Sequence, residues 1–156
     1  MQAADNPPES ESNSTRYAGP LALGHAMSRL ALADEGAAFT RDGPRADVEY
    51  RDLGWSAATD GRIGAKHIRA IAPFTAETGW HWHDMHAHFV IVLRGWITFR
   101  YAGVDDEVTV RAGASLSQPA GVPHNVIARS DDMELIEINV PADFATVDLA
   151  ASAATR

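Results

Sequence analysis

Hydrophobic residues recur in short alternating runs along most of the chain, and this pattern is typical of half-buried β-strands. The runs are four to eight residues long, and turn residues such as Asp60-Gly61 and Arg94-Gly95 separate them. Many short strands broken in this way predict an all-β domain that closes as a barrel or a sandwich. The predicted strands are residues 48–53, 65–71, 80–83, 88–93, 96–101, 107–111, 115–118, 125–129 and 133–140.

The two ends of the chain have a different pattern. Residues 1–20 are rich in Gln, Asp, Asn, Pro, Glu and Ser, and this composition predicts a flexible tail. Residues 21–39 are rich in Ala and Leu, with Leu23, Met27 and Leu30 at helical spacing, so we expect a short helix there. We therefore divide the chain into the tail, an N-terminal helical or loop extension (21–47), the barrel (48–141) and a C-terminal tail (142–156) that forms a brief helix or stays irregular.

Length and composition narrow the range of functions. A single domain is the simplest organisation for 156 residues, because a chain of this length can bury a core without cross-links. The 13 basic and 21 acidic residues give a formal charge of −8 with no basic patch, which argues against nucleic-acid and anionic membrane partners. The absence of cysteine excludes disulfides, thiolate ligands and cysteine nucleophiles. With no signal peptide and no long apolar run, a cytoplasmic protein is expected.

Histidine is concentrated in one short stretch, since four of the seven histidines lie within residues 81–88. Imidazole is the commonest protein ligand for transition metals, so this density indicates a metal site. Side chains alternate along a strand, so His81 and His83 share one face, and His86 and His88 likewise share a face. A bend in the chain between the two pairs would direct the imidazoles of both pairs at one point. The more distant His124 follows a turn at 119–123, and a second hairpin could deliver it to the same place.

The spacing within this stretch resembles the first motif of the cupin superfamily. That motif reads Gly-x5-His-x-His-x3,4-Glu-x6-Gly, and the chain fits it at His81, at His83 and at the later Gly95. The chain departs from the motif at two positions. Thr75 stands where the family has its first glycine, and His88 stands where the family has its glutamate.

The second cupin motif, Gly-x5-Pro-x-Gly-x2-His-x3-Asn, is also recognisable. The chain fits it at Gly113, Pro119, Gly121 and His124, whereas Ala128 replaces the final asparagine. The resemblance implies a small single-domain jelly-roll barrel of the cupin 2-like kind, with one metal ion held at the barrel mouth. It also implies a homodimer, because cupin barrels commonly pair through a sheet face.

The resemblance implies a ligand set of His81, His83, His88 and His124 for one divalent transition-metal ion, namely Fe, Mn, Ni, Cu or Zn. Four neutral imidazoles leave the site with a charge of about +2, whereas three histidines and a glutamate leave about +1, so the ion would be a stronger Lewis acid. The replacement also removes the internal carboxylate base of the site. His86 then becomes the candidate proton carrier at the cavity mouth. The alternatives are a metal-free barrel with a polar pocket and, for His86, an ordinary loop histidine.

Other residues have simpler interpretations. His25 and His67 are expected to be structural or exposed. Glu137 and Asn139 alternate with apolar neighbours, and this alternation allows them either to face solvent or to line a pocket. The inward faces of two strands are expected to fill the core or to shape an apolar pocket, and they carry Val90, Val92, Ile97, Phe99 and Tyr101.

The resemblance implies a metal-dependent enzyme, and within that class we favour a dioxygenase acting on a small organic substrate such as an enolisable carbonyl or phenolic compound. One alternative is a zinc-type Lewis-acid isomerase, cyclase or lyase that uses the same site. A second alternative is a cupin that binds a small ligand without catalysis. A third is a degenerate barrel kept for dimerisation, although the intact histidine set argues against it.

Overall fold

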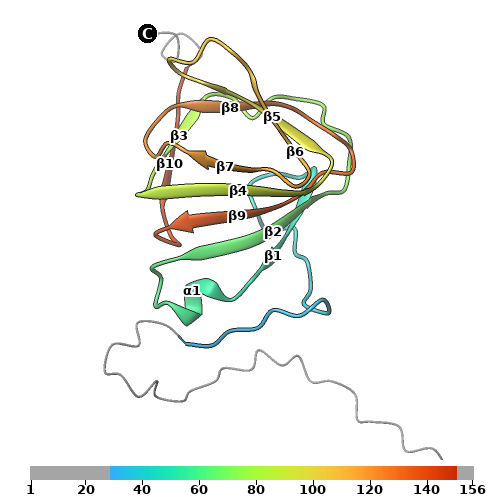
Figure 1. Ribbon diagram of the computed structural model, residues 1–156, viewed down its shortest axis with the longest axis vertical. Coiled ribbons are helices and arrows are strands. Elements are labelled where there is room, and N and C mark those ends of the chain that lie inside the picture. Colours follow the sequence, from blue (N-terminus) through green and yellow to red (C-terminus); the bar gives the residue numbers. More distant parts are fainter. Residues whose placement is uncertain (1–28, 151–156) are drawn as a thin grey trace, which may run out of the picture.

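The computed structural model describes residues 29–150, which fold into ten strands and one short helix. The strands lie in two five-stranded antiparallel sheets that face each other as a jelly roll (Figure 1). The elements are β1 (Val48–Asp52), α1 (Trp55–Ala58), β2 (Gly64–Ala70), β3 (His81–Asp84), β4 (Ala87–Arg94), β5 (Trp96–Tyr101), β6 (Val108–Arg111), β7 (Ser115–Gln118), β8 (His124–Arg129), β9 (Glu134–Val140) and β10 (Ala145–Asp148). The first sheet has the order β1-β2-β9-β4-β7 and the second β10-β3-β8-β5-β6.

The alternation in the sequence accounts for the strands. Each of the nine predicted runs forms a strand, and the observed ends of each strand differ from the predicted ends by at most one residue. Strand β4 shows the relation most clearly. Its inward side chains, among them Val90 and Val92, are at most 3% exposed, whereas the outward side chains of Phe89, Ile91 and Leu93 are 36–49% exposed. The all-β barrel expected from the sequence is therefore confirmed.

The core fills the space between the two sheets. Its members are aliphatic and aromatic side chains from both sheets, including Val90 and Val92 from β4 and Ile97, Phe99 and Tyr101 from β5, as the sequence predicts. At the end of the barrel where β4 begins, the apolar core gives way to a polar row. Register pairing across the first sheet places Gly64, Asn139, His88 and Gln118 side by side in that row.

The N-terminal extension differs from the expectation. Residues 29–39 contain no helix; the remainder of the predicted helix and the predicted flexible tail lie outside the described residues. A local turn competes with helix formation here, because the Asp34 carboxylate accepts a hydrogen bond from the Gly36 amide at 3.0 Å. Phe39 then packs edge-on against His67 of β2, with ring centroids 5.1 Å apart. In the described part of the chain, no helix is long and apolar enough to cross a membrane.

The C-terminal segment also differs from the expectation. Residues 145–148, predicted to lie in a tail, form β10 and pair with β3, so the barrel extends beyond residue 141 (Figure 1). The only sequence signal for this strand is the β-branched pair Thr146-Val147. All four residues of β10 are exposed, so the strand lacks the apolar alternation that marks the others.

Candidate metal centre

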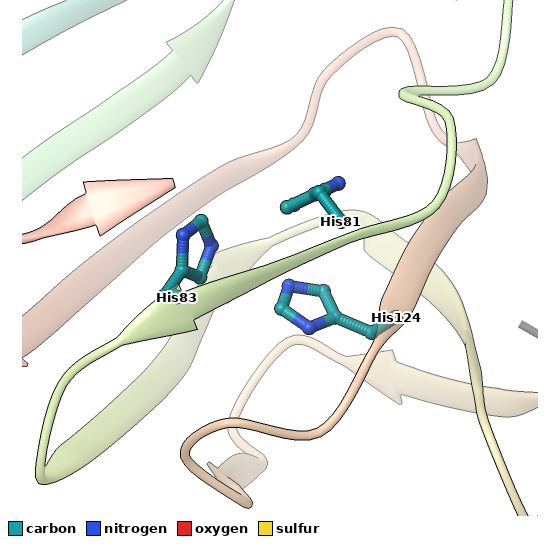
Figure 2. Close-up of side chains that lie close together, drawn as sticks. All are labelled: His81, His83 and His124. Atoms are coloured by element: carbon teal, nitrogen blue, oxygen red, sulfur yellow. The ribbon is translucent and has the colours of Figure 1, made fainter. Parts of the chain in front are cut away.

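Three imidazole side chains converge at the polar end of the barrel (Figure 2). His81 and His83 come from the same face of β3, and His124 begins β8, where it is the register partner of His81. One ring nitrogen from each histidine lies within 4.8 Å of the others. The ring centroid of His81 lies 4.5 Å from that of His124 and 5.0 Å from that of His83. Strand parity and sheet register thus bring together three of the four histidines predicted as ligands.

The second nitrogen of each ring is already hydrogen-bonded. Two of the partners are backbone carbonyls, which can only accept, so Nδ1 of those two rings carries a proton and Nε2 is the atom available to a metal ion. A neutral imidazole held through its other nitrogen is the form that binds a metal ion. The donor set therefore fits a transition-metal ion. The three contacts are His81 Nδ1 to Gly79 O (2.9 Å), His124 Nδ1 to Val122 O (3.1 Å) and His83 Nδ1 with Thr146 Oγ1 (2.9 Å).

His88, the fourth predicted ligand, lies beside this cluster. Its ring centroid is 5.4 Å from that of His83 and 6.3 Å from that of His124. The side chain is buried, and its Nε2 hydrogen-bonds to the Glu137 carboxylate at 3.0 Å. The nitrogen that a metal ion would use is thus occupied by a carboxylate. In this arrangement His88 belongs to a histidine–glutamate pair next to the three-imidazole cluster.

Glu137 is a functional candidate that the sequence leaves undecided. Strand β9 pairs with β4 so that Glu137 lies opposite Val90 on the inner face, and its side chain lines the cavity. Burial acts to raise the pKa of this carboxyl, but the hydrogen bond and charge of His88, with a smaller contribution from Asn139, outweigh it and lower the pKa. The carboxyl is therefore ionised at neutral pH. Strand β9 therefore places an ionised carboxylate beside the histidines, whereas the sequence predicts a site without an internal carboxylate.

A second hydrogen bond, between Tyr101 and Gln118, lies next to the same nitrogen of His88. The Tyr101 hydroxyl donates to Gln118 Oε1 at 2.7 Å, and the Gln118 amide nitrogen lies 3.5 Å from His88 Nε2. Burial raises the pKa of the Tyr101 hydroxyl, so Tyr101 stays protonated and acts as a donor. Both side chains are at most 5% exposed. The Tyr101 hydrogen bond therefore fixes the orientation of the Gln118 amide next to His88.

The four histidines open onto a cavity of about 240 Å³ between the two sheets. Its walls are mainly apolar, and Glu137, Lys66 and Arg45 are among the charged residues that line it. A cavity with such walls excludes most water and suits a small organic molecule. The apolar lining includes Tyr50, Ile68, Val90, Phe99, Val126 and Phe144.

His86 and His67 lie away from the cavity. His86, the predicted proton carrier, is exposed between β3 and β4, and its side chain is not part of the cavity lining formed by the described residues. His67 is buried on the outer face of β2, where it contacts Arg51 at 3.0 Å and Glu134 at 3.2 Å. His67 is therefore structural, as expected, and His25 lies outside the described residues.

The pKa values of the cluster predict a pH-dependent stability. Burial, reinforced by neighbouring imidazoles, lowers the pKa of both His83 and His124 to about 4, compared with an ordinary value of 6.5. Between these values the unfolded chain binds protons that the folded chain does not, so the metal-free protein loses stability as the pH falls from about 6.5 to about 4. The expected loss is on the order of 1–3 kcal/mol in total, after allowance for the partial exposure of His83.

Urea unfolding in EDTA at several pH values measures this effect. The His83→Gln variant should show a shallower dependence of unfolding free energy on pH than the parent protein. Equal slopes for the two proteins would contradict the assignment of this pH dependence to His83.

Comparison with known proteins supports the fold. A family model described as a cupin domain (Cupin_2) matches residues 67–140, whereas no curated protein sequence matches the chain. KdgF from Halomonas sp. is similar in structure, with a TM-score of 0.55, 15% identity and coverage of 70% of this chain and 93% of that one. The polyketide cyclase RemF from Streptomyces resistomycificus has a TM-score of 0.58, 16% identity and coverage of 78% and 87%.

Oxalate decarboxylase from Bacillus subtilis is similar over 73% of this chain, with a TM-score of 0.55 and 16% identity. The present chain spans only 30% of that enzyme's chain. At these levels of identity the structural similarities establish the fold alone.

Proposed function

We propose that this chain, whose residues 67–140 match a cupin domain, is a metal-dependent enzyme acting on a small organic substrate such as an enolisable carbonyl or phenolic compound. One observation carries the proposal. Three imidazoles converge at the end of an apolar cavity, and an ionised carboxylate, Glu137, lies next to them through its bond to His88.

The proposed ligands are His81, His83 and His124, which would hold one divalent transition-metal ion. Imidazole suits Fe, Ni, Cu and Zn, and Mn(II) centres occur in Bacillus subtilis oxalate decarboxylase. His88 could serve as the fourth ligand only by giving up its 3.0 Å bond to Glu137. When bound, the ion would supply Lewis-acid polarisation of substrate oxygen atoms.

The remaining residues of the site are equipped for proton transfer. The Glu137 carboxylate can accept a proton from a carbon next to a carbonyl group, or from a hydroxyl group, of a substrate in the cavity. His88 orients that carboxylate, and the apolar walls keep out competing water. The same carboxyl can return the proton to a different atom. This set of roles favours isomerisation, cyclisation or lyase chemistry.

A dioxygenase, favoured from the sequence, is the second candidate. Two features support it: a set of three neutral imidazoles leaves coordination positions open, and an apolar cavity protects reactive species from water. A non-catalytic binding protein would need the same cavity but no internal base. Glu137 therefore favours an enzyme over a binder.

Solvent deuterium exchange and oxygen uptake can separate these candidates. We expect metal-loaded protein in D₂O to incorporate deuterium at the enolisable carbon of diketones or phenolic ketones, without consuming oxygen. Oxygen uptake in proportion to substrate loss would show a dioxygenase instead. Full metal loading with neither activity across a broad panel would overturn the enzyme proposal. The His124→Ala variant is the control for metal dependence.

The homodimer and the cytoplasmic location expected from the sequence stay predictions. The homodimer has one structural support, since Phe89, Ile91 and Leu93 expose 36%, 38% and 49% of their surface on the outer face of the first sheet. An apolar sheet face of this kind suits pairing with a second copy of the chain. Light scattering coupled to gel filtration measures the oligomeric state directly.

A further inference from the structure

Strand β10 lies beyond residue 140, where the match to the family model ends. It nevertheless forms part of the metal centre. Strand β10 lies along β3, the strand that carries His81 and His83 (Figure 1). All four residues of β10 pair with β3, and Thr146 is the register partner of His83. Phe144 and Thr146 line the cavity. The C-terminal segment is therefore a wall of the site as well as an edge of the sheet.

The contacts of this segment are concentrated on one imidazole. Thr146 Oγ1 lies 2.9 Å from His83 Nδ1. The Phe144 ring packs against the same imidazole, with centroids 5.1 Å apart and an interplanar angle of 75°. One contact restrains a ring nitrogen and the other restrains the ring plane. Together they restrict the rotation of His83 about its side-chain bonds.

His83 differs in this respect from the two neighbouring ligands. The Nδ1 atoms of His81 and His124 bond to carbonyls only two residues away in the sequence, so a local turn orients each ring. The partner of His83 lies 63 residues further along the chain. The orientation of His83 therefore depends on the docking of a separate element.

The chemical nature of the hydrogen-bond partner is a second difference between His83 and the other two histidines. A carbonyl accepts only, whereas a threonine hydroxyl can either accept or donate, so the metal-free protein permits two tautomers of His83. Metal binding through Nε2 requires the tautomer in which Nδ1–H donates to Thr146 Oγ1. Valine, which has nearly the same shape as threonine, can take neither role.

We propose that Thr146 is a positioning residue of the metal centre, which holds the His83 ring and its Nδ1 proton in the arrangement required for metal binding. This inference rests on the proposed metal centre. It makes β10 a functional part of this chain's site, beyond the segment that matches the family.

Metal titration of the full chain tests the inference. Zn²⁺ affinity is measured by competition with a chromophoric chelator for the parent, Thr146→Val, Thr146→Ser and Val147→Ala. Thr146→Val is expected to weaken binding by about 10- to 100-fold. Thr146→Ser, which keeps the hydroxyl, should stay near the parent. Val147 lies on the same strand, pairs with Trp82 and is 38% exposed, so Val147→Ala controls for a general weakening of β10.

A second measurement does not depend on metal affinity. Imidazole ¹⁵N chemical shifts of the metal-free protein report which nitrogen of His83 carries the proton. We expect Thr146→Val to change the tautomer ratio of His83 and to leave His81 and His124 in the Nδ1–H form.

The possible failures are distinguishable. Parent-like affinity together with an unchanged tautomer ratio in Thr146→Val would overturn this inference alone. An equal loss of affinity in Val147→Ala would also overturn it, because the effect would then come from strand docking in general. Absence of Zn²⁺ binding by the parent chain would overturn the proposed metal centre, and this inference with it.

Discussion

Replacement of His124 by alanine is expected to reduce the metal content of the purified protein from about one ion per chain to a small fraction of that amount. His124 is 4% exposed and contributes one of the three convergent nitrogens, so its loss leaves two imidazoles facing a void. Elemental analysis of protein expressed without a histidine tag measures the outcome. Metal binding should also stabilise the parent protein, by about 2.7 kcal/mol at a free metal concentration of 100 times Kd.

His86→Ala is the matched control for this prediction. It removes the same type of side chain from the same stretch of sequence, but His86 is exposed and lies outside the cavity lining. This variant should keep its metal. Equal metal loss in both variants would contradict the assignment, as would a parent protein that is metal-free and unaffected by EDTA. His86→Ala also tests the proton-carrier role predicted from the sequence, which unchanged turnover between about pH 6 and 8 would dismiss.

Replacement of Glu137 by glutamine is expected to lower kcat by about 10²- to 10⁴-fold while metal affinity changes little. The amide oxygen of glutamine can still accept the hydrogen bond from His88 Nε2, so the geometry is kept. An amide cannot accept a proton from substrate, so the proposed base is lost. Steady-state kinetics on the substrate identified by deuterium exchange, together with the metal titration, separate the two effects.

Glu134→Gln is the control for this second prediction. Glu134 lies on the same strand as Glu137, but it bonds to His67 on the outer face of the sheet, at 3.2 Å. This change should leave kcat near the parent value. A Glu137→Gln variant with parental kcat would show that the carboxylate is not the base, and the proton-transfer proposal would then fail.

Most of the barrel could be predicted from the sequence, because inward and outward residues alternate wherever a strand has one buried face. The alternation in β4 places Val90 and Val92 inside without any structural information. The histidine cluster could be predicted for a similar reason. Strand parity aligns His81 with His83, and the motif spacing identifies His124 as their distant partner.

Other features are left open or predicted wrongly from the sequence. Two of them depend on how strands pair with one another, and the alternation within a single strand contains no information about that pairing. Parity leaves Glu137 free to face either way, and only the register of β9 against β4 turns it inward next to His88. Strand β10 escapes prediction because its residues are exposed and carry no apolar pattern. In residues 29–39, the Asp34 carboxylate forms a local turn with the Gly36 amide, and no helix is present there.

The two faces of β4 have a consequence for how the chain folds. Phe89, Ile91 and Leu93 on the outer face are at least as hydrophobic as Val90 and Val92 on the inner face. A shift of one residue in pairing would exchange the faces, and burial of apolar surface alone would not prevent it. Such a shift would carry His88 out of the barrel and leave the Glu137 carboxylate without its partner, at a cost of roughly 1–3 kcal/mol or more. The hydrogen bond that orients the proposed base thus also stabilises the native strand alignment relative to this alternative.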